Sequence, residues 1–214
     1  MCTRFTHTAV VLCCVCVSTG LAGGDSYPMA MNLGAIGVII GHELLHGFDN
    51  SGRRFDKDGF LRQWWPNNVI TAFTRKTQCM IDQYDHIQVQ NVTVDGYNTL
   101  GENIADNGGV HMAYLALQWY KAQLAAFNLT DPLPPAKSPL TTDQLFYWAH
   151  AQTWCTVSTQ AAIQWQVAVD EHAPGEARVW APLVNQPASQ FARAYNCPVG
   201  SRMNPPVNRK CDLY

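Results

Sequence analysis

Charged side chains are scarce in this sequence. They make up 14% of its 214 residues, whereas soluble domains average about 25%. The net charge is −2 and there is no long basic run, so the chain lacks the electrostatic footprint of a nucleic-acid-binding protein. Because hydrophobic residues reach 47%, we expect part of the surface to pack against another body of protein.

The N-terminus lacks an apolar run of the about 20 residues that a membrane span requires. Its apolar run, residues 9–17, is shorter, follows Arg4 and precedes small residues up to Gly24. This order is typical of a secretory signal peptide. We predict a signal peptide over residues 1–24, with a short membrane anchor as the alternative, and one domain over residues 25–214. The protein would then be secreted, or held at the cell surface by the anchor.

After residue 24 the sequence has no C-x-x-C pair, which argues against a zinc site built from cysteines. Four cysteines remain there, at positions 79, 155, 197 and 211. An even number of cysteines suits an oxidising compartment. The sequons at Asn91 and Asn128 also predict a secreted, glycosylated protein.

The sequence does contain an H-E-x-x-H motif, His42-Glu43-Leu44-Leu45-His46. We predict a helix over residues 33–48, in which residues four apart lie on one face. Both imidazoles could then bind one zinc ion, and Glu43 could take the proton of a water that the metal activates. An ordinary helix with two histidines is the alternative. The apolar run 35–40 favours a buried helix whose polar groups need partners.

A second motif supplies a candidate third ligand. Glu102 and Asp106 lie four residues apart among small and apolar neighbours. Glu102 could bind the metal while Asp106 accepts a hydrogen bond from a zinc-binding imidazole and fixes its tautomer. A solvated acidic helix face is the alternative.

Together these motifs resemble the neprilysin and endothelin-converting enzyme family of zinc metallopeptidases. The likeness covers residues 27–214 and includes further matches at Asp56-Lys57-Asp58-Gly59, Trp64-Trp65, Thr77-Gln78-Cys79-Met80, Trp154-Cys155, Asp170-Glu171-His172-Ala173-Pro174-Gly175 and Met203-Asn204-Pro205. It is a likeness to the C-terminal catalytic third of the family's ectodomains. The family's Asn-Ala strand, which aligns the substrate, and its N-terminal roof have no counterpart in the sequence.

The resemblance implies a mainly α fold, the C-terminal catalytic portion of a thermolysin-like (gluzincin) zinc peptidase. It implies one zinc ion per chain, bound by His42, His46 and Glu102, with Glu43 as the general base. Asp106 would hydrogen-bond the first of the two histidines, and Asp49 the second.

The resemblance also assigns residues to a peptide substrate. His172 would donate to the oxyanion and Arg178 to a backbone carbonyl, because an imidazole and a guanidinium can both donate hydrogen bonds there. Val38, Ile39 and Trp154 would line an apolar pocket. From the residues alone, a surface histidine, a surface arginine and ordinary core packing remain the alternatives.

The resemblance further implies a disulfide between Cys79 and Cys211. Cys155 and Cys197 correspond to cysteines whose family partners lie in the N-terminal part. They would be thiols, or be bridged to each other or to another chain.

Hydrophobic periodicity and breakers predict the other elements. We expect helices over 69–84, from Glu102 past Gly109 to Leu124, over 142–155 and over 187–195. We expect a short hairpin or loop over 85–97 with its turn at Asp95-Gly96, a turn rather than a calcium loop at 56–59, and core positions for Trp64, Trp65 and Phe73.

Three functional hypotheses follow. The first is a zinc-dependent endopeptidase that hydrolyses peptides with a metal-activated water. The second is a secreted, non-catalytic relative that binds zinc or peptide, and the third is a fragment of a longer peptidase.

Overall fold

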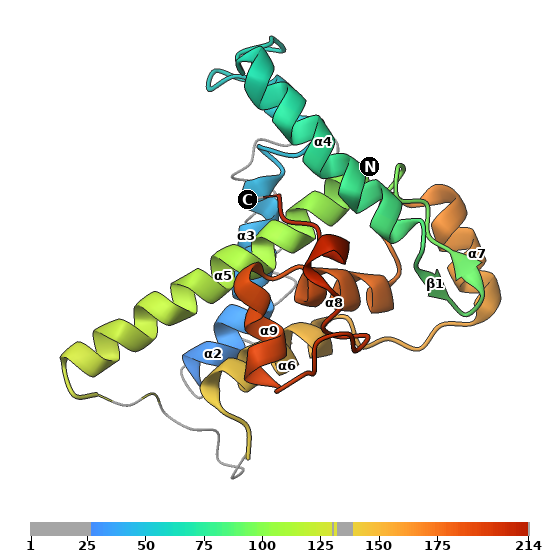
Figure 1. The fold of residues 1–214 in the computed structure, drawn as a ribbon. Helices are drawn as coiled ribbons and strands as arrows, with labels where there is room; N and C mark the ends of the chain where they lie inside the picture. The colour runs from blue at the N-terminus through green and yellow to red at the C-terminus, as the bar shows by residue number, and fades with distance from the viewer. Residues whose placement is uncertain (1–26, 130, 132–138, 214) are drawn as a thin grey trace.

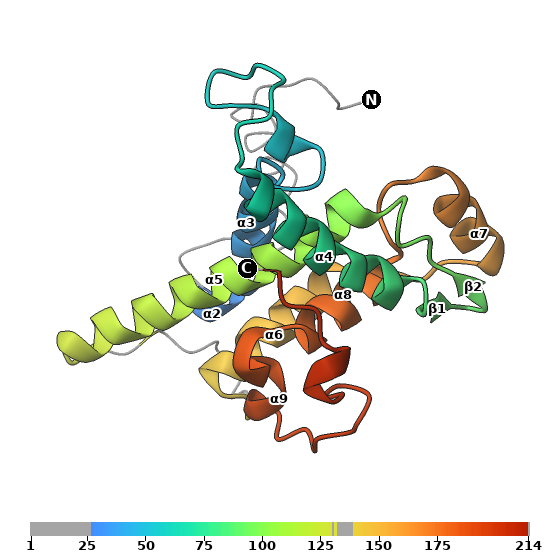
Figure 2. The ribbon, with the colours of Figure 1, turned by 45° about the horizontal axis from the view of Figure 1, so that its top comes forward.

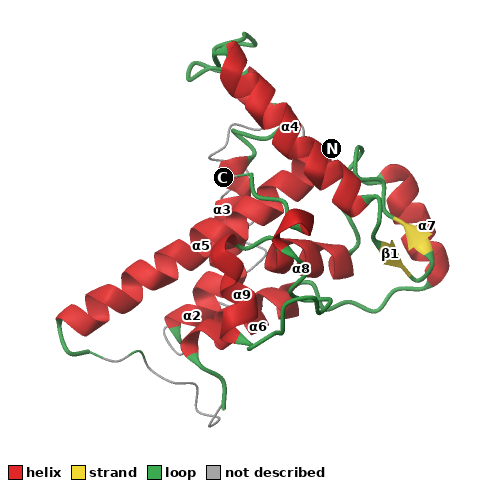
Figure 3. Cartoon of the chain, viewed as in Figure 1, coloured by secondary structure: helices red, strands yellow, loops and turns green. Residues whose placement is uncertain are grey.

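The computed structural model describes residues 27–129, 131 and 139–213, and it is mainly helical, as predicted (Figures 1 and 3). The predicted signal peptide, residues 1–24, lies outside the described residues. Within the described part of the chain, no helix combines the length and the apolar character that crossing a membrane would require.

The long helix α5, Leu100–Ala126, runs through the centre of the molecule, and its C-terminal end extends beyond the other helices (Figure 1). Beside it lies a helical segment made of α2 (Met29–Asn32), the π-helical turn η1 (Leu33–Gly37) and α3 (Val38–Leu45). This segment covers most of the predicted helix over 33–48, but it begins earlier, at Met29, and ends at Leu45.

Helices α3 and α5 approach each other so closely that glycine is required on both sides of the contact. A Cβ atom at Gly109 would lie 2.8 Å from the backbone nitrogen of His42 and from the carbonyl oxygen of Val38. A Cβ atom at Gly41 would lie 3.0 Å from the carbonyl oxygen of Gly109. The absence of side chains here lets the two backbones touch, and it sets His42 directly against the helix that carries Glu102.

The remaining elements surround this helix pair (Figure 2). Their bounds are η2 Gly52–Arg54, α4 Asn67–Tyr84, β1 Gln88–Val89, β2 Val92–Thr93, α6 Thr142–Thr153, α7 Gln160–Val169, α8 Gly175–Val184, η3 Pro187–Ser189, α9 Gln190–Ala194 and η4 Val207–Arg209. Helices α4 and α8 pack on α5, and α7 packs on the hairpin. Threonines cap the N-termini of α6 and α7. Thr141 exchanges hydrogen bonds with Gln144, and the Thr159 hydroxyl accepts one from the backbone N–H of Ala162.

The largest hydrophobic cluster fixes the segment α2–α3 and α6 onto α5. It includes Val38, Leu117, Phe146, Tyr147 and Phe191, all buried. A second cluster gathers Phe73, Met80 and Ile104 around the end of the chain at Cys211.

Cys79 on α4 and Cys211 form a disulfide across 132 residues of sequence, the pairing that the family resemblance implies. Cys155 is an exposed free thiol and Cys197 a half-buried one.

The structure corrects the predicted hairpin turn. The strands pair antiparallel as Gln88 with Thr93 and Val89 with Val92, so the turn is at Gln90-Asn91, both with positive φ. Two residues with positive φ give the backbone twist that a two-residue hairpin needs, and asparagine tolerates this conformation. Asp95 instead accepts backbone hydrogen bonds from Tyr97 and Asn98 just before α5.

The predicted core position of Trp64 is also wrong. The side chain is 46% exposed, whereas its neighbour Trp65 is half-buried against Phe73, with ring centroids 5.4 Å apart. The rings of the two tryptophans pack edge to face with their centroids 5.8 Å apart, and Trp64 is the more exposed of the pair. Only Phe73 of the three aromatic residues is buried. The predicted turn at 56–59 is present, with the N–H groups of Asp58 and Phe60 donating to the Asp56 carboxylate.

The glycine contact can be tested by Gly109→Ala. The added methyl group would overlap the α3 backbone, so we expect the free energy of unfolding to fall by about 1–3 kcal/mol. Thermal unfolding followed by circular dichroism measures this. Gly47→Ala is the matched control, because its Cβ would meet only the carbonyl oxygen of Leu44 at 3.4 Å. Equal melting temperatures for the two variants would contradict the tight crossing.

The cysteine arrangement can be tested by peptide mapping without reduction. We expect a peptide pair linked through Cys79 and Cys211, with Cys155 and Cys197 open to alkylation. A Cys79–Cys155 link, or four alkylated thiols in secreted material, would show that the described pairing does not form.

Candidate active site

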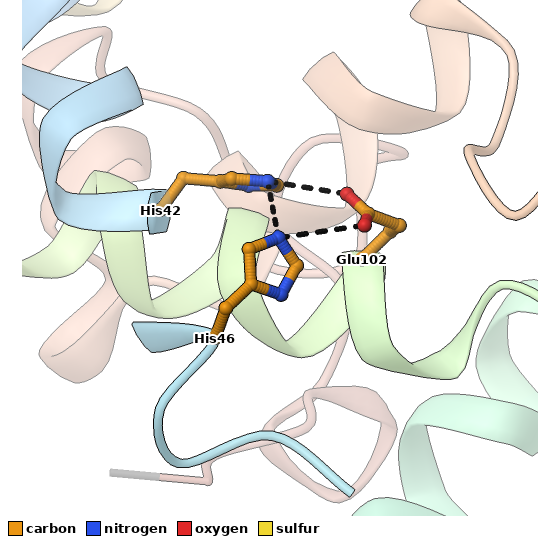
Figure 4. A group of neighbouring side chains, drawn as sticks. All are labelled: His42, His46 and Glu102. Carbon is orange, nitrogen blue, oxygen red and sulfur yellow. Dashed lines mark hydrogen bonds and ion pairs between the residues drawn. The ribbon is translucent and has the colours of Figure 1, made fainter. Parts of the chain in front are cut away.

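Two helices bring three donor atoms together. His42 lies on α3, His46 directly after it, and Glu102 on α5 (Figure 4). The Nε2 atoms of the two histidines are 3.0 Å apart, the His42 Nε2 is 3.1 Å from Glu102 Oε2, and the His46 Nε2 is 3.4 Å from Glu102 Oε1. These atoms could hold a metal ion.

The spacing of the donors fits zinc. Bonds of about 2.0–2.1 Å to nitrogen and oxygen in a tetrahedron put neighbouring ligand atoms about 3.3–3.4 Å apart. The three separations, 3.0, 3.1 and 3.4 Å, lie at or slightly below that value. Two imidazoles and one carboxylate, all from rigid helices or their ends, are also a usual donor set for a catalytic zinc site with one open position.

Carboxylates fix the orientation of both imidazoles. The Nδ1 of His42 lies 2.8 Å from Asp106 Oδ1, and the Nδ1 of His46 lies 2.8 Å from Asp49 Oδ2. With a proton held on each Nδ1, it is the Nε2 atoms that face Glu102, and loss of the Nε2 proton would leave a lone pair for a metal. The structure thus brings together each histidine and the aspartate predicted to orient it.

The Asp106 carboxylate is buried and hydrogen-bonded to three nitrogen atoms of two residues, Arg178 and His42. Arg178 on α8 donates from Nε to Oδ2 and from Nη2 to Oδ1, both at 2.8 Å, while His42 shares Oδ1. Burial opposes the charged carboxylate, but the Arg178 guanidinium and the His42 ring outweigh it and hold the pKa of Asp106 well below its usual range. The guanidinium also stacks on Trp154, 3.8 Å from the ring centroid.

His172 meets the same cluster from the segment before α8. Its Nε2 is 3.0 Å from Glu102 Oε2, and its Nδ1 and backbone N–H both contact Asp170 Oδ1. The hydrogen bond to Glu102 raises the pKa of the His172 ring despite partial burial. Hydrogen bonds from His172 and His42 in turn lower the pKa of Glu102, against the effect of its own burial.

The other predicted site residues lie close by in the fold. Glu43 is half-buried on α3 between the two histidines. Ile39 is half-buried one turn earlier. Val38 is only 2% exposed and packs in the largest hydrophobic cluster, so the core-packing alternative describes its position. Asp49 is buried, and its Oδ1 accepts the N–H groups of Ser51 and Gly52.

Sequence reasoning missed the polar residues behind the site. Asn107 on α5 accepts a hydrogen bond from Asn185 and donates one to Tyr84. Asp170, which contacts the His172 ring, was not predicted as a site residue. A carboxylate two residues before His172 is a signal that could have identified it. Asn107 and Asn185 are far apart in the sequence and gave no such signal.

Comparisons with known proteins agree with this geometry. The sequence pattern of the family described as Peptidase family M13 matches residues 24–212. The chain belongs to peptidase family M13. The fold and the family are those of zinc metallopeptidases, and the resemblance to the neprilysin and endothelin-converting enzyme family is confirmed.

Individual relatives cover most of this chain but only part of their own length. Endothelin-converting enzyme 1 of Homo sapiens is 45% identical over 190 residues, 88% of this chain and 23% of the human protein. Neprilysin-1 of Caenorhabditis elegans is 43% identical over 88% of this chain and 24% of its own. The zinc metalloprotease Zmp1 of Mycobacterium tuberculosis, solved with an inhibitor, superposes with a TM-score of 0.74 at 33% identity, over 86% of this chain and 27% of that one. The chain spans about a quarter of the length of these relatives.

The charge on His42 gives a test of metal binding that needs no substrate. Burial disfavours its imidazolium, but hydrogen bonds to Asp106 and Glu102 outweigh burial and raise the pKa of His42 to about 9. Zinc must therefore displace a proton from this ring at pH 7.5, and we expect about one released proton from His42 per bound ion. Below pH 9 the apparent affinity should rise about tenfold per pH unit.

Titration calorimetry at pH 7.5 in buffers of different ionisation enthalpy measures this proton release. The Asp106→Asn variant should release fewer protons, because a neutral amide stabilises the imidazolium less. Zinc binding with no proton release at pH 7.5 would contradict a charged His42 in the metal-free protein.

Proposed function

We propose that this chain is the catalytic portion of a secreted zinc endopeptidase that cleaves peptides. The observation that carries the proposal is the donor set of His42, His46 and Glu102, at separations that suit one zinc ion, with a carboxylate behind each histidine. When bound, zinc would supply a Lewis acid that polarises the scissile carbonyl and lowers the pKa of a water.

The chain's own residues would carry the proton. Glu43 follows His42 on α3, so its carboxylate belongs to the helix that presents both imidazoles. In the proposed reaction Glu43 takes a proton from the attacking water and then delivers it to the amine that leaves. A half-buried carboxylate suits this exchange because it remains accessible to water and substrate.

Two further side chains would bind the peptide. His172, held by Asp170 and with a raised pKa, would donate a hydrogen bond to the developing oxyanion. Arg178 is fixed by Asp106 on one side and by Trp154 on the other, so its guanidinium could donate to a backbone carbonyl with little loss of conformational freedom. Ile39 and Trp154 would contribute apolar contacts to the substrate.

The surroundings support a protein that works outside the cell. The disulfide between Cys79 and Cys211 suits an oxidising compartment. Both sequon asparagines are exposed, Asn91 at the tip of the hairpin and Asn128 just after α5. We therefore propose glycosylation at both positions.

The assignment of Glu43 is tested by Glu43→Gln. The amide cannot accept the proton of water, so we expect zinc to stay bound at one ion per chain while hydrolysis of an internally quenched peptide falls by at least about a thousandfold. Glu176→Gln is the matched control: it removes the charge of an exposed glutamate that pairs with Arg202, and it should leave both zinc and hydrolysis unchanged.

Removing a ligand should give a different result. Glu102→Ala leaves two histidines, and we expect it to lose zinc as well as activity. Full turnover by Glu43→Gln would reject the general-base role. Zinc bound by the unaltered chain without any hydrolysis would point instead to a non-catalytic relative that binds zinc or peptide.

A further inference from the structure

A concave site lies between the segment 53–65 and the start of α4, and none of the three proposed zinc ligands lines it. It is a cavity of about 260 Å³. Its walls include Arg53, Arg54, Arg62, Leu61, Trp64 and Trp65. Guanidinium groups and indole rings are thus concentrated around one hollow in a chain that is otherwise poor in charge.

Two of the arginines have no acidic partner. Segment 53–65 has four basic and two acidic residues. Both acidic groups are in use: Asp58 pairs with Lys57 at 2.9 Å and Asp56 pairs with Arg62 at 2.7 Å. Among the residues that the structure describes, no carboxylate pairs with Arg53 or Arg54. Their positive charges are therefore not neutralised at the cavity wall.

Arg53 is held in place and still has an unsatisfied donor. Its guanidinium lies 5.3 Å from the ring centroid of Phe73 and 5.8 Å from that of Trp65. Its Nε is buried and has no hydrogen-bond acceptor within the described part of the chain. Arg53 is therefore held at the cavity wall by its contacts with the two rings and not by a hydrogen bond from Nε.

Apolar side chains lie in the same segment as the charged hollow. Phe60 and Leu61 are each 60% exposed and Trp64 is 46% exposed. Exposed apolar groups that gather in one place mark a binding surface rather than ordinary solvent exposure. A ligand that fits this surface carries a negative group beside an apolar one.

The cavity is linked to the zinc-ligand cluster through one turn. The Asp49 carboxylate contacts the ring of His46 and accepts the backbone N–H groups of Ser51 and Gly52. The backbone N–H of Arg53 in turn donates to the Asp49 carbonyl at 3.2 Å. The first residue of the cavity wall is therefore tied to the residue that orients a proposed zinc ligand.

We propose that this cavity is an exosite, a substrate-binding site separate from the reacting residues, for an acidic segment of a peptide. An Asp or Glu of the peptide sits between Arg53 and Arg54, where a guanidinium can bind both carboxylate oxygens. A neighbouring apolar side chain of the peptide packs on Trp64. The inference rests on the proposed function, because a peptidase is what brings peptide chains to this face.

The test measures binding without cleavage. The full chain carrying Glu43→Gln is titrated with a fluorescein-labelled decapeptide that has Glu-Phe-Glu at its centre, and with the same peptide carrying Gln-Phe-Gln. Fluorescence anisotropy gives both dissociation constants. We expect the acidic peptide to bind at least about tenfold more tightly, and this difference to shrink as salt is raised.

Charge reversal locates the site. Arg54→Glu, added to Glu43→Gln, should weaken binding of the acidic peptide about tenfold or more and leave the Gln-Phe-Gln peptide within about twofold. Arg75→Glu is the matched control, because Arg75 is exposed on α4 and does not line the cavity. Circular dichroism checks that each variant is folded, and Arg54→Gln replaces Arg54→Glu if the reversal unfolds the chain.

Three outcomes would overturn the exosite. These are equal affinity for the two peptides, an Arg54 variant that behaves like Arg75→Glu, and displacement of the peptide by sodium sulfate at an equal concentration, which would indicate a site for any small anion. Hydrolysis by the unaltered chain is measured separately on a neutral quenched peptide. If the neutral peptide is cleaved but the acidic and neutral decapeptides bind equally, the exosite alone is rejected. If no peptide is cleaved, the proposed function is rejected.

Discussion

The buried carboxylate of Asp106 is the group on which the rest of the site depends. It is 1% exposed, and its two oxygens serve the His42 ring from α3 and the Arg178 guanidinium from α8. A buried charge is stable only while it is paired, and removing one partner of such a pair typically costs about 3–5 kcal/mol. The positions of three helices are therefore set by one side chain. The same contact orients a proposed zinc ligand and a proposed substrate-binding arginine.

Neutral side-chain amides form a second hydrogen-bond network beside the charged groups of the site. Asn185, just after α8, donates to the side-chain oxygens of Gln83 and Asn107, and its own oxygen accepts the backbone N–H of Cys211. Gln83 belongs to α4, and the hydrogen bond from Asn107 to Tyr84 joins that helix to the network a second time. Because these buried groups find partners on four separate segments, the network favours one packing of α4, α5, α8 and the disulfide-bonded C-terminus. The end of the chain thus supports the helix that carries Glu102.

The sequence predicted those parts of the site that depend on helical periodicity. Residues four apart share a face, so the pairs His42 with His46 and Glu102 with Asp106 could each be placed from their spacing alone. Periodicity does not say which helices cross, and the contact of Gly41 with Gly109 became visible only in the structure. His172 and Arg178 were assigned by family resemblance, because the residues around them have no pattern that points to a site. The hairpin turn was misplaced because Asp95-Gly96 is a strong turn signal. In the structure these two residues lie in the turn just before α5, where Asp95 accepts hydrogen bonds from Tyr97 and Asn98.

Asp49 connects the segment that leads to Arg53 with the end of the helix that carries the proposed metal ligands. Its carboxylate orients His46 with one oxygen and holds the backbone of Ser51 and Gly52 with the other. A Cβ atom at Gly52 would overlap the carbonyl of His46, so only glycine lets this turn fold back against the end of α3. Arg53 and Arg54 follow directly after this turn. The carboxylate that orients the His46 imidazole thus also holds the backbone turn that leads to Arg53 and Arg54.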